Sequence, residues 1–129
     1  MKNRPISEFM TPHPHSVGKG QPLSKAHELM REHKIRHLPV LEAGRIVGLL
    51  SQRDLHLIET LSDVDPTEVT VEEAMSQEPY TVAPTTPLSE VAGEMARRKL
   101  GATVIADGAH VVGMFTTVDA LEVLQKALA

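Results

Sequence analysis

The chain has 129 residues and a formal net charge of −4, and its aromatic residues are only two phenylalanines and one tyrosine. Its length suits one domain or two small lobes. With so few aromatic residues, the core must be aliphatic. The acidic balance argues against binding to duplex DNA, which relies on many lysine and arginine contacts to phosphates, and the shortage of aromatic residues argues against a surface for single-stranded nucleic acid. The sequence has no cysteine, which excludes disulfides and thiolate zinc sites.

The amino-terminal segment MKNRPISEFM (residues 1–10) lacks an apolar run of signal-peptide length. No stretch approaches the roughly 20 apolar residues that a membrane span requires, and a chain without cysteine is compatible with a reducing compartment. We therefore expect a cytoplasmic protein that has no membrane partner.

The chain contains two copies of one pattern, which align without a gap when the sequence is shifted by 65 positions (119 − 54 = 65). The shift places Asp54 on Asp119, and it also aligns methionine, proline and glycine residues along most of the chain. Such self-similarity predicts two copies of one supersecondary unit. We assign residues 6–62 to the first repeat, residues 63–70 to a linker and residues 71–128 to the second repeat.

Each copy predicts the order strand, helix, strand, strand, helix. In the first copy, a short extended piece precedes apolar residues at helical spacing over residues 23–30. The stretch HLPVLEAGRIVGLLS (37–51) predicts a hairpin that turns at Ala43-Gly44. A second helix is expected just past Ser51.

The second copy predicts the same elements at the equivalent positions. Helical spacing recurs over residues 88–95, where Thr86-Pro87 predicts an N-cap followed by a proline at the first helical position. The stretch ATVIADGAHVVGMFT (102–116) predicts a hairpin with its turn at Asp107-Gly108. Another helix is expected just past Thr116.

These patterns predict a mixed α/β (α+β) fold built from two β-α-β-β-α repeats. One such repeat has a small sheet whose apolar face it cannot cover alone. Two repeats related by a pseudo-twofold axis can cover each other by packing through their sheets, so we expect an α/β sandwich of two lobes.

The second helix of each copy carries more apolar residues than one core needs. A helix that faces one core and solvent requires a single apolar stripe, whereas each of these helices has two. A broad stripe in a small protein would explain this, but we favour a second contact surface, most simply a twofold homodimer through these helices. The stripes are Leu55 with Ile58, Leu57 with Leu61, and Leu121, Leu124 and Leu128 beside Val123 and Ala127.

The stretches GLLSQRD (48–54) and GMFTTVD (113–119) place a hydroxyl residue at the start of a helix and an aspartate three residues later. The simplest interpretation is a capping box that satisfies amide groups at the helix end. The alternative is a ligand site. The amino end of a helix attracts phosphate, and a nearby carboxylate can accept hydrogen bonds from ribose hydroxyls.

The two copies resemble tandem cystathionine-β-synthase (CBS) domains, a pair known as a Bateman module. The resemblance covers nearly the whole chain and is specific for the fold. It is carried by MTP (10–12), IRHLPV (35–40), IVGLLSQRDL (46–55), VEEAMSQEPYTV (71–82) and VVGMFTTVD (111–119).

The resemblance implies a regulatory module that binds an adenosyl ligand such as AMP, ADP or ATP, or in some members S-adenosylmethionine or NAD, in clefts between the repeats. It implies that Asp54 and Asp119 bind ribose and that Ser51 and Thr116 bind ribose or phosphate. Backbone groups around Ser16-Val17 and Thr81-Val82 would line an adenine slot, and Pro39 of the LPV stretch completes the expected site.

The two copies differ in the charges near these turns. The first copy has Arg36-His37 before the LPV stretch and Arg53 beside Asp54, and these cations can meet phosphates. The second copy has Gly101-Ala102 and Val118 instead. We therefore expect the site with Asp54 to take the phosphorylated ligand, although ordinary surface charge explains the arginines about equally well.

The HPH stretch places two imidazoles on one side of an extended chain at His13 and His15, and His27 sits at an apolar helix position. A zinc site needs about four ligands, and the sequence offers no third, so we expect no metal site. His37 near phosphates has a second possible use as a pH sensor.

The sequence favours a binding module over an enzyme. It has no cysteine nucleophile, G-x-S-x-G elbow or Walker loop, so we expect no catalytic residues and no catalytic cofactor. A signal would have to reach a separate protein effector. The remaining alternative is a structural dimerisation module that binds no ligand, in which both turns serve only as helix caps.

Overall fold

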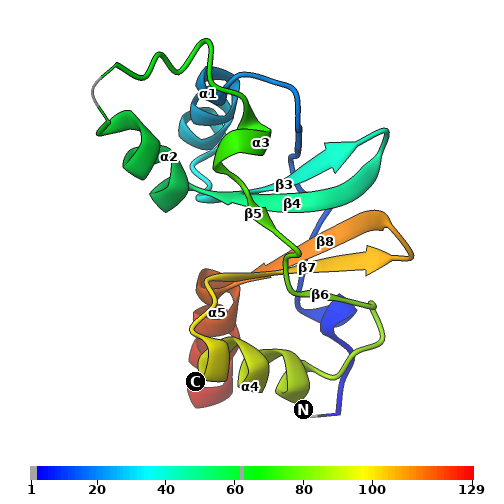
Figure 1. Cartoon of the computed structure of the whole chain (residues 1–129). Coiled ribbons are helices and arrows are strands. Elements are labelled where there is room, and N and C mark those ends of the chain that lie inside the picture. The colour runs from blue at the N-terminus through cyan, green and yellow to red at the C-terminus, as the bar shows by residue number, and fades with distance from the viewer. Residues whose placement is uncertain (1–2, 62) are drawn as a thin grey trace. The chain divides into compact units, whose positions relative to one another are not determined.

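The computed structural model describes residues 3–61 and 63–129, so Ser62, at the end of the expected first repeat, lies outside the described residues. The chain forms two compact units. We call residues His15–Pro79 the central unit, and the residues up to Pro14 together with Tyr80–Ala129 the terminal unit (Figure 1).

The central unit has a four-stranded sheet of order β2-β3-β4-β5, in which β2 and β3 are parallel and the other neighbours are antiparallel. Its buried core lies between this sheet and the helices, and it is entirely aliphatic apart from methionine. The elements are β2 (Val17–Gly18), α1 (Leu23–His33), β3 (His37–Glu42), β4 (Arg45–Ser51), α2 (Gln52–Glu59), α3 (Val71–Ala74) and β5 (Ser76–Gln77).

The terminal unit repeats this plan with a sheet of order β1-β8-β7-β6, in which only β6 and β7 are parallel. Phe115 is fully buried in its core. The elements are the 3₁₀ turn η1 (Ile6–Glu8), β1 (Thr11–Pro12), β6 (Thr81–Val82), α4 (Leu88–Arg98), β7 (Ala102–Asp107), β8 (His110–Thr116) and α5 (Thr117–Leu128).

The first segment of each sequence repeat belongs to the unit formed mainly by the other repeat. β1 pairs with β8, and β5 pairs with β4. Ile6 is fully buried in the terminal unit and Val71 in the central unit. The compact units therefore differ from the sequence repeats, because the two repeats exchange the short segments at their starts.

Two aligned glycines make room for this exchange. A Cβ atom at Gly48 would collide with the Met75 side chain and the Ser76 carbonyl, and one at Gly113 would collide with the Met10 side chain. The aligned methionines and glycines of the two copies thus make the same close packing contact in each unit.

The expected helices and hairpins are present, with two local corrections. Ala43 and Gly44 both have positive φ (50° and 78°), as a type I′ turn requires. The second turn is formed by residues 108–109, one position later than expected, because Asp107 still pairs with His110. The expected N-cap at Thr86 is also wrong, because Pro87 is itself the N-cap of α4.

The two apolar stripes on the second helices face in different directions. On α2, Leu55 is buried in the core, whereas the Leu57 side chain is 66% exposed. On α5, Val123 packs against the core, whereas Leu121 and Leu124 are 63% and 53% exposed. Each unit therefore covers only one stripe of its second helix.

Candidate ligand-binding site

In the central unit, β4 runs directly into α2 through the Ser51–Asp54 turn. The Ser51 backbone N–H donates to Asp54 Oδ2 at 2.9 Å, and the Asp54 N–H donates to Ser51 Oγ at 3.1 Å. The two bonds form a complete capping box. The helix-cap interpretation is therefore confirmed for this turn, and any ligand must bind to a turn that is already ordered.

The same box forms in the terminal unit, where β8 runs into α5. The Thr116 N–H donates to Asp119 Oδ2 at 2.9 Å, and the Asp119 N–H donates to Thr116 Oγ1 at 3.3 Å. The Thr11 hydroxyl also donates to Asp119 Oδ1 at 3.2 Å. Thr11 is not among the residues expected at this turn from the sequence, because only the pairing of β1 with β8 brings it there.

The two carboxylates consequently differ in their bonding. Both Asp119 oxygens accept bonds, Oδ1 from Thr11 and Oδ2 from Thr116. Among the described residues, Asp54 accepts its one side-chain bond through Oδ2, which leaves Oδ1 as an acceptor for other donors.

The expected basic residues of the first copy adjoin the Ser51–Asp54 turn. His37 pairs with Ser51 across β3 and β4, and the Gln52 N–H donates to the Arg36 carbonyl at 2.8 Å. The side chains of Arg36 and Arg53 are exposed. The structure thus gathers Arg36, His37, Arg53 and the capping box at one end of the hairpin.

Burial lowers the pKa of His37 below its usual value of 6.5. The negative charge of Asp54 opposes this shift, and the positive charge of Arg36 adds to it. His37 is therefore predominantly a neutral imidazole at pH 7, and the positive charge at this turn comes from the two arginines.

The residues expected to line an adenine slot lie on the sheets. Val17 is 2% exposed and pairs with Val40 of β3, next to the buried Pro39. Ser16 is exposed just before this strand. Because the Val17 side chain packs into the core, only its backbone groups are available to a ligand.

In the terminal unit, Thr81 and Val82 pair with Val104 and Ile105 of β7. Thr81 is exposed, and Val82 packs against the core. The Gly101 carbonyl accepts a hydrogen bond from the Thr117 N–H at 3.1 Å. The same backbone bond joins Arg36 and Gln52 in the central unit, but here a glycine takes the place of the arginine.

No group of three or more histidine, aspartate or glutamate residues within residues 3–61 and 63–129 is arranged to hold a metal ion. His15 stacks on His33 at 3.6 Å between ring centroids, and His13 belongs to the other unit. Over the same described residues, no helix combines the length and the apolar character needed to cross a membrane.

The CBS domain family model matches residues 6–57 and 71–126. The chain therefore belongs to the CBS domain family, as the sequence predicted, and it carries a pair of these domains. It is 29% identical over 109 residues to the CBS domain-containing protein YhcV of Bacillus subtilis, and the match covers 84% of this chain and 77% of YhcV.

Other relatives are much longer proteins. The chain is 32% identical over 98 residues to an inosine-5′-monophosphate dehydrogenase of Korarchaeum cryptofilum and 30% identical over 124 residues to a homoserine O-acetyltransferase of Methanocorpusculum labreanum. These matches cover 75% and 93% of this chain, but only 19% and 24% of those relatives. The similarity therefore concerns the CBS part of each.

Solved structures confirm the expected fold. AcuB from Vibrio cholerae has a TM-score of 0.86 at 30% identity, with 96% of this chain and 92% of that chain covered. CBSX2, whose crystal structure is in complex with AMP, has a TM-score of 0.87 at 24% identity, with 98% and 99% covered. The mixed α/β CBS-pair fold predicted from the sequence is thus confirmed.

Proposed function

We propose that the chain is a regulatory module that binds an adenosyl ligand of the AMP, ADP or ATP class and passes a conformational signal to a protein effector. The observation that carries the proposal is the free Oδ1 atom of Asp54 in an ordered turn flanked by Arg36 and Arg53. A diol can donate to this carboxylate while the arginines meet phosphate.

Two structural relatives support the ligand class. CBSX2 is in complex with AMP, and the CBS domain pair of protein MJ0100 is in complex with 5′-methylthioadenosine and S-adenosyl-L-methionine. The three ligands share an adenosyl group and differ in charge. In our proposal, Asp54 binds ribose, Ser51, Arg36 and Arg53 meet the ribose or phosphates, and neutral His37 adds a hydrogen bond.

The remaining expected residues complete the proposal. Ser16, Val17 and Pro39 would border the base in the central unit, and Thr81 and Val82 in the terminal unit. Thr116 and Asp119 would form a second ribose site, which lacks adjacent arginines and prefers a less charged ligand. We expect the chain itself to perform no catalysis.

The second candidate is a structural dimerisation module without a ligand. It is favoured by one observation, because both capping boxes are complete without any ligand. In this case the outward leucines of α2 and α5 would carry the function.

A thermal-shift panel separates the two candidates. AMP, ADP, ATP, NAD and S-adenosylmethionine are compared on the wild type, Asp54→Asn and Asp119→Asn. A ligand at 100 times its dissociation constant adds about 2.7 kcal/mol, which raises the midpoint by several degrees. We expect an adenine nucleotide to stabilise the wild type and Asp54→Asn to lose this effect. No shift with any compound would reject the proposal.

A further inference from the structure

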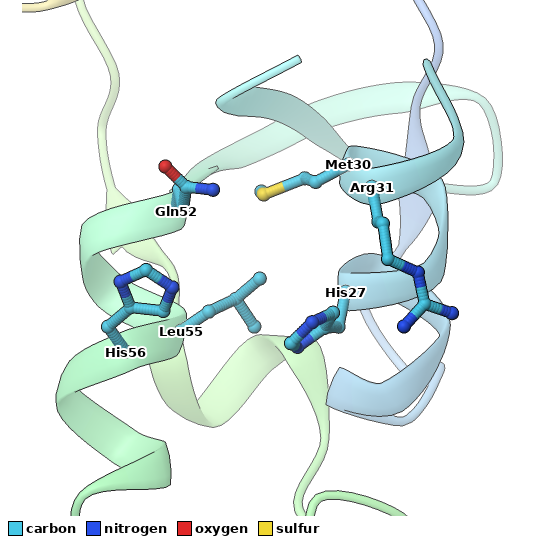
Figure 2. Close-up of a pocket in the computed structure, with 6 residues that line it drawn as sticks. All are labelled: His27, Met30, Arg31, Gln52, Leu55 and His56. Atoms are coloured by element: carbon cyan, nitrogen blue, oxygen red, sulfur yellow. The ribbon is translucent and has the colours of Figure 1, made fainter. Parts of the chain in front are cut away.

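The central unit has a hollow between α1 and α2 that shares only Gln52 with the Ser51–Asp54 turn. Its volume is about 150 Å³, and none of its lining residues is among the expected ligand-binding residues. Figure 2 shows Met30 and Leu55 pointing into it from opposite helices. Both side chains are almost fully buried, so the hollow has an apolar floor.

The rim of this hollow is polar and rich in hydrogen-bond donors. It consists of His27 and Arg31 from α1 and Gln52 and His56 from α2 (Figure 2). Among the described residues, the side chains of Arg31, Gln52 and His56 have no hydrogen-bond or ion-pair partner. An exposed guanidinium, an amide and an imidazole therefore surround an apolar floor with their donors free.

Nearby acids limit the charge that this rim can accept. His27 Nδ1 lies 2.6 Å from Glu59 Oε1, so the Glu59 carboxylate is already engaged. Glu28 and Glu59 line an adjoining hollow that also includes His27 and Arg31. A group with two negative charges would be repelled by these carboxylates, whereas a single charge can be balanced by Arg31.

The second repeat provides an internal comparison. At the positions 65 residues later, the floor residue Met30 corresponds to Met95, but Arg31 and His56 correspond to Ala96 and Leu121. His27 corresponds to Ala92. The floor methionine is thus common to both copies, although Leu55 corresponds to the smaller Ala120. The two imidazoles and the guanidinium of the rim belong to the first copy alone, since only Gln52 has a polar counterpart, Thr117.

We propose that this hollow binds a small aliphatic monocarboxylate. The Arg31 guanidinium would pair with the carboxylate, since its planar fork matches that group, and Gln52 and His56 would add hydrogen bonds. The aliphatic body would lie on Met30 and Leu55. A volume well below that of a drug-sized pocket restricts the ligand to a few carbon atoms.

The test is an NMR titration of the ¹⁵N-labelled full chain with butyrate at constant ionic strength. We expect saturable shifts of backbone amides that centre on Arg31, Leu55 and His56. Arg31→Gln should weaken the affinity about tenfold or more, as expected for the loss of a charged hydrogen-bonding partner. Arg31 is exposed, so this variant keeps the fold.

Lys25→Gln is the matched control, because it removes one positive charge from α1 without touching the hollow, and it should bind like the wild type. Butyramide, the neutral counterpart of butyrate, should not bind. The proposal is overturned if the shifts do not saturate, if Arg31→Gln binds as well as the wild type, or if inorganic phosphate binds the same residues more tightly. Nucleotide binding at Asp54 has no bearing on these outcomes.

Discussion

At the scale of single residues, Thr103 is a polar side chain in an otherwise apolar core. It is fully buried, and its hydroxyl has no hydrogen-bond partner among the described residues. It lies on β7 opposite Phe115, at the position that Leu38 occupies in the first copy. An unpaired buried hydroxyl carries a desolvation cost without the compensating bond.

Replacing Thr103 with valine should therefore stabilise the protein. The two side chains have nearly the same shape, so Thr103→Val removes the unpaired hydroxyl without creating a cavity, and we expect a gain of about 1 kcal/mol in the free energy of unfolding. Urea denaturation measures this change. Thr85→Val, at an exposed turn position, is the control and should give no gain. A loss of stability in Thr103→Val would mean that the hydroxyl has a partner.

His37 should make the folded state sensitive to mild acid. Its folded pKa lies below 6.5 because of burial, so below pH 6.5 the unfolded chain takes up a proton that the folded chain resists. The free energy of unfolding therefore falls as the pH drops from 6.5 toward the folded pKa, and it is unaffected above that window.

Urea denaturation at a series of pH values tests this dependence. His37→Gln should flatten the decline between neutral and mildly acidic pH, whereas His110→Gln, at an exposed site of the terminal unit, should keep it. An unchanged slope in His37→Gln would assign the acid sensitivity to another group.

At the scale of elements, the exchanged first segments depend on close contact between a methionine and a glycine. At Gly113 the three atoms nearest to an added Cβ all belong to the Met10 side chain, whereas at Gly48 they include the Ser76 backbone carbonyl oxygen, 2.9 Å away. A flexible side chain can be removed by mutation, but a backbone carbonyl cannot. The two copies should therefore respond differently to the same pair of substitutions.

We expect Gly113→Ala and Gly48→Ala each to destabilise the protein by about 1 to 3 kcal/mol, the usual cost of overpacking. Adding Met10→Ala should remove most of the extra cost of Gly113→Ala, whereas Met75→Ala should rescue Gly48→Ala only in part. Double-mutant cycles by urea denaturation measure both couplings. Equal rescue in the two copies would contradict the role of the Ser76 carbonyl.

The sequence predicted the helices and hairpins better than it predicted which strands pair with one another. Helical spacing and the turn at Ala43-Gly44 are local signals, and the structure has both elements where they were expected. The pairing of β1 with β8 joins residues about 100 positions apart, and two-residue strands carry no periodic signal. The bond from Thr11 to Asp119 depends on that pairing, so it was not predictable from either motif alone.

The candidate site shows the same division between local and nonlocal information. The capping boxes follow from a spacing of three residues and were anticipated as one of two interpretations. The depressed pKa of His37 depends on its burial in the folded unit, which the sequence does not express. The local pattern thus located the turns, whereas the fold lowers the pKa of His37.

At the scale of the whole molecule, the outward stripe of α5 indicates self-association. Leu121, Leu124 and Leu128 are more than half exposed in a single chain, although leucine is usually buried. Leu57 and Leu61 are similarly exposed in the central unit. Each unit thus exposes an apolar stripe on its second helix that a stripe of a second copy can cover, as in a twofold dimer.

We therefore expect the wild type to sediment as a dimer across a concentration series and the double variant Leu121→Asp with Leu124→Asp to sediment as a monomer. These side chains lie outside the core of the single chain, so the variant should keep its far-ultraviolet circular dichroism. Glu122→Gln, on the same helix, should remain dimeric. A monomeric wild type would refute the dimer, and a dimeric double variant would place the contact elsewhere. Loss of helical signal in the variant would instead mean that the leucines support the fold of α5 itself.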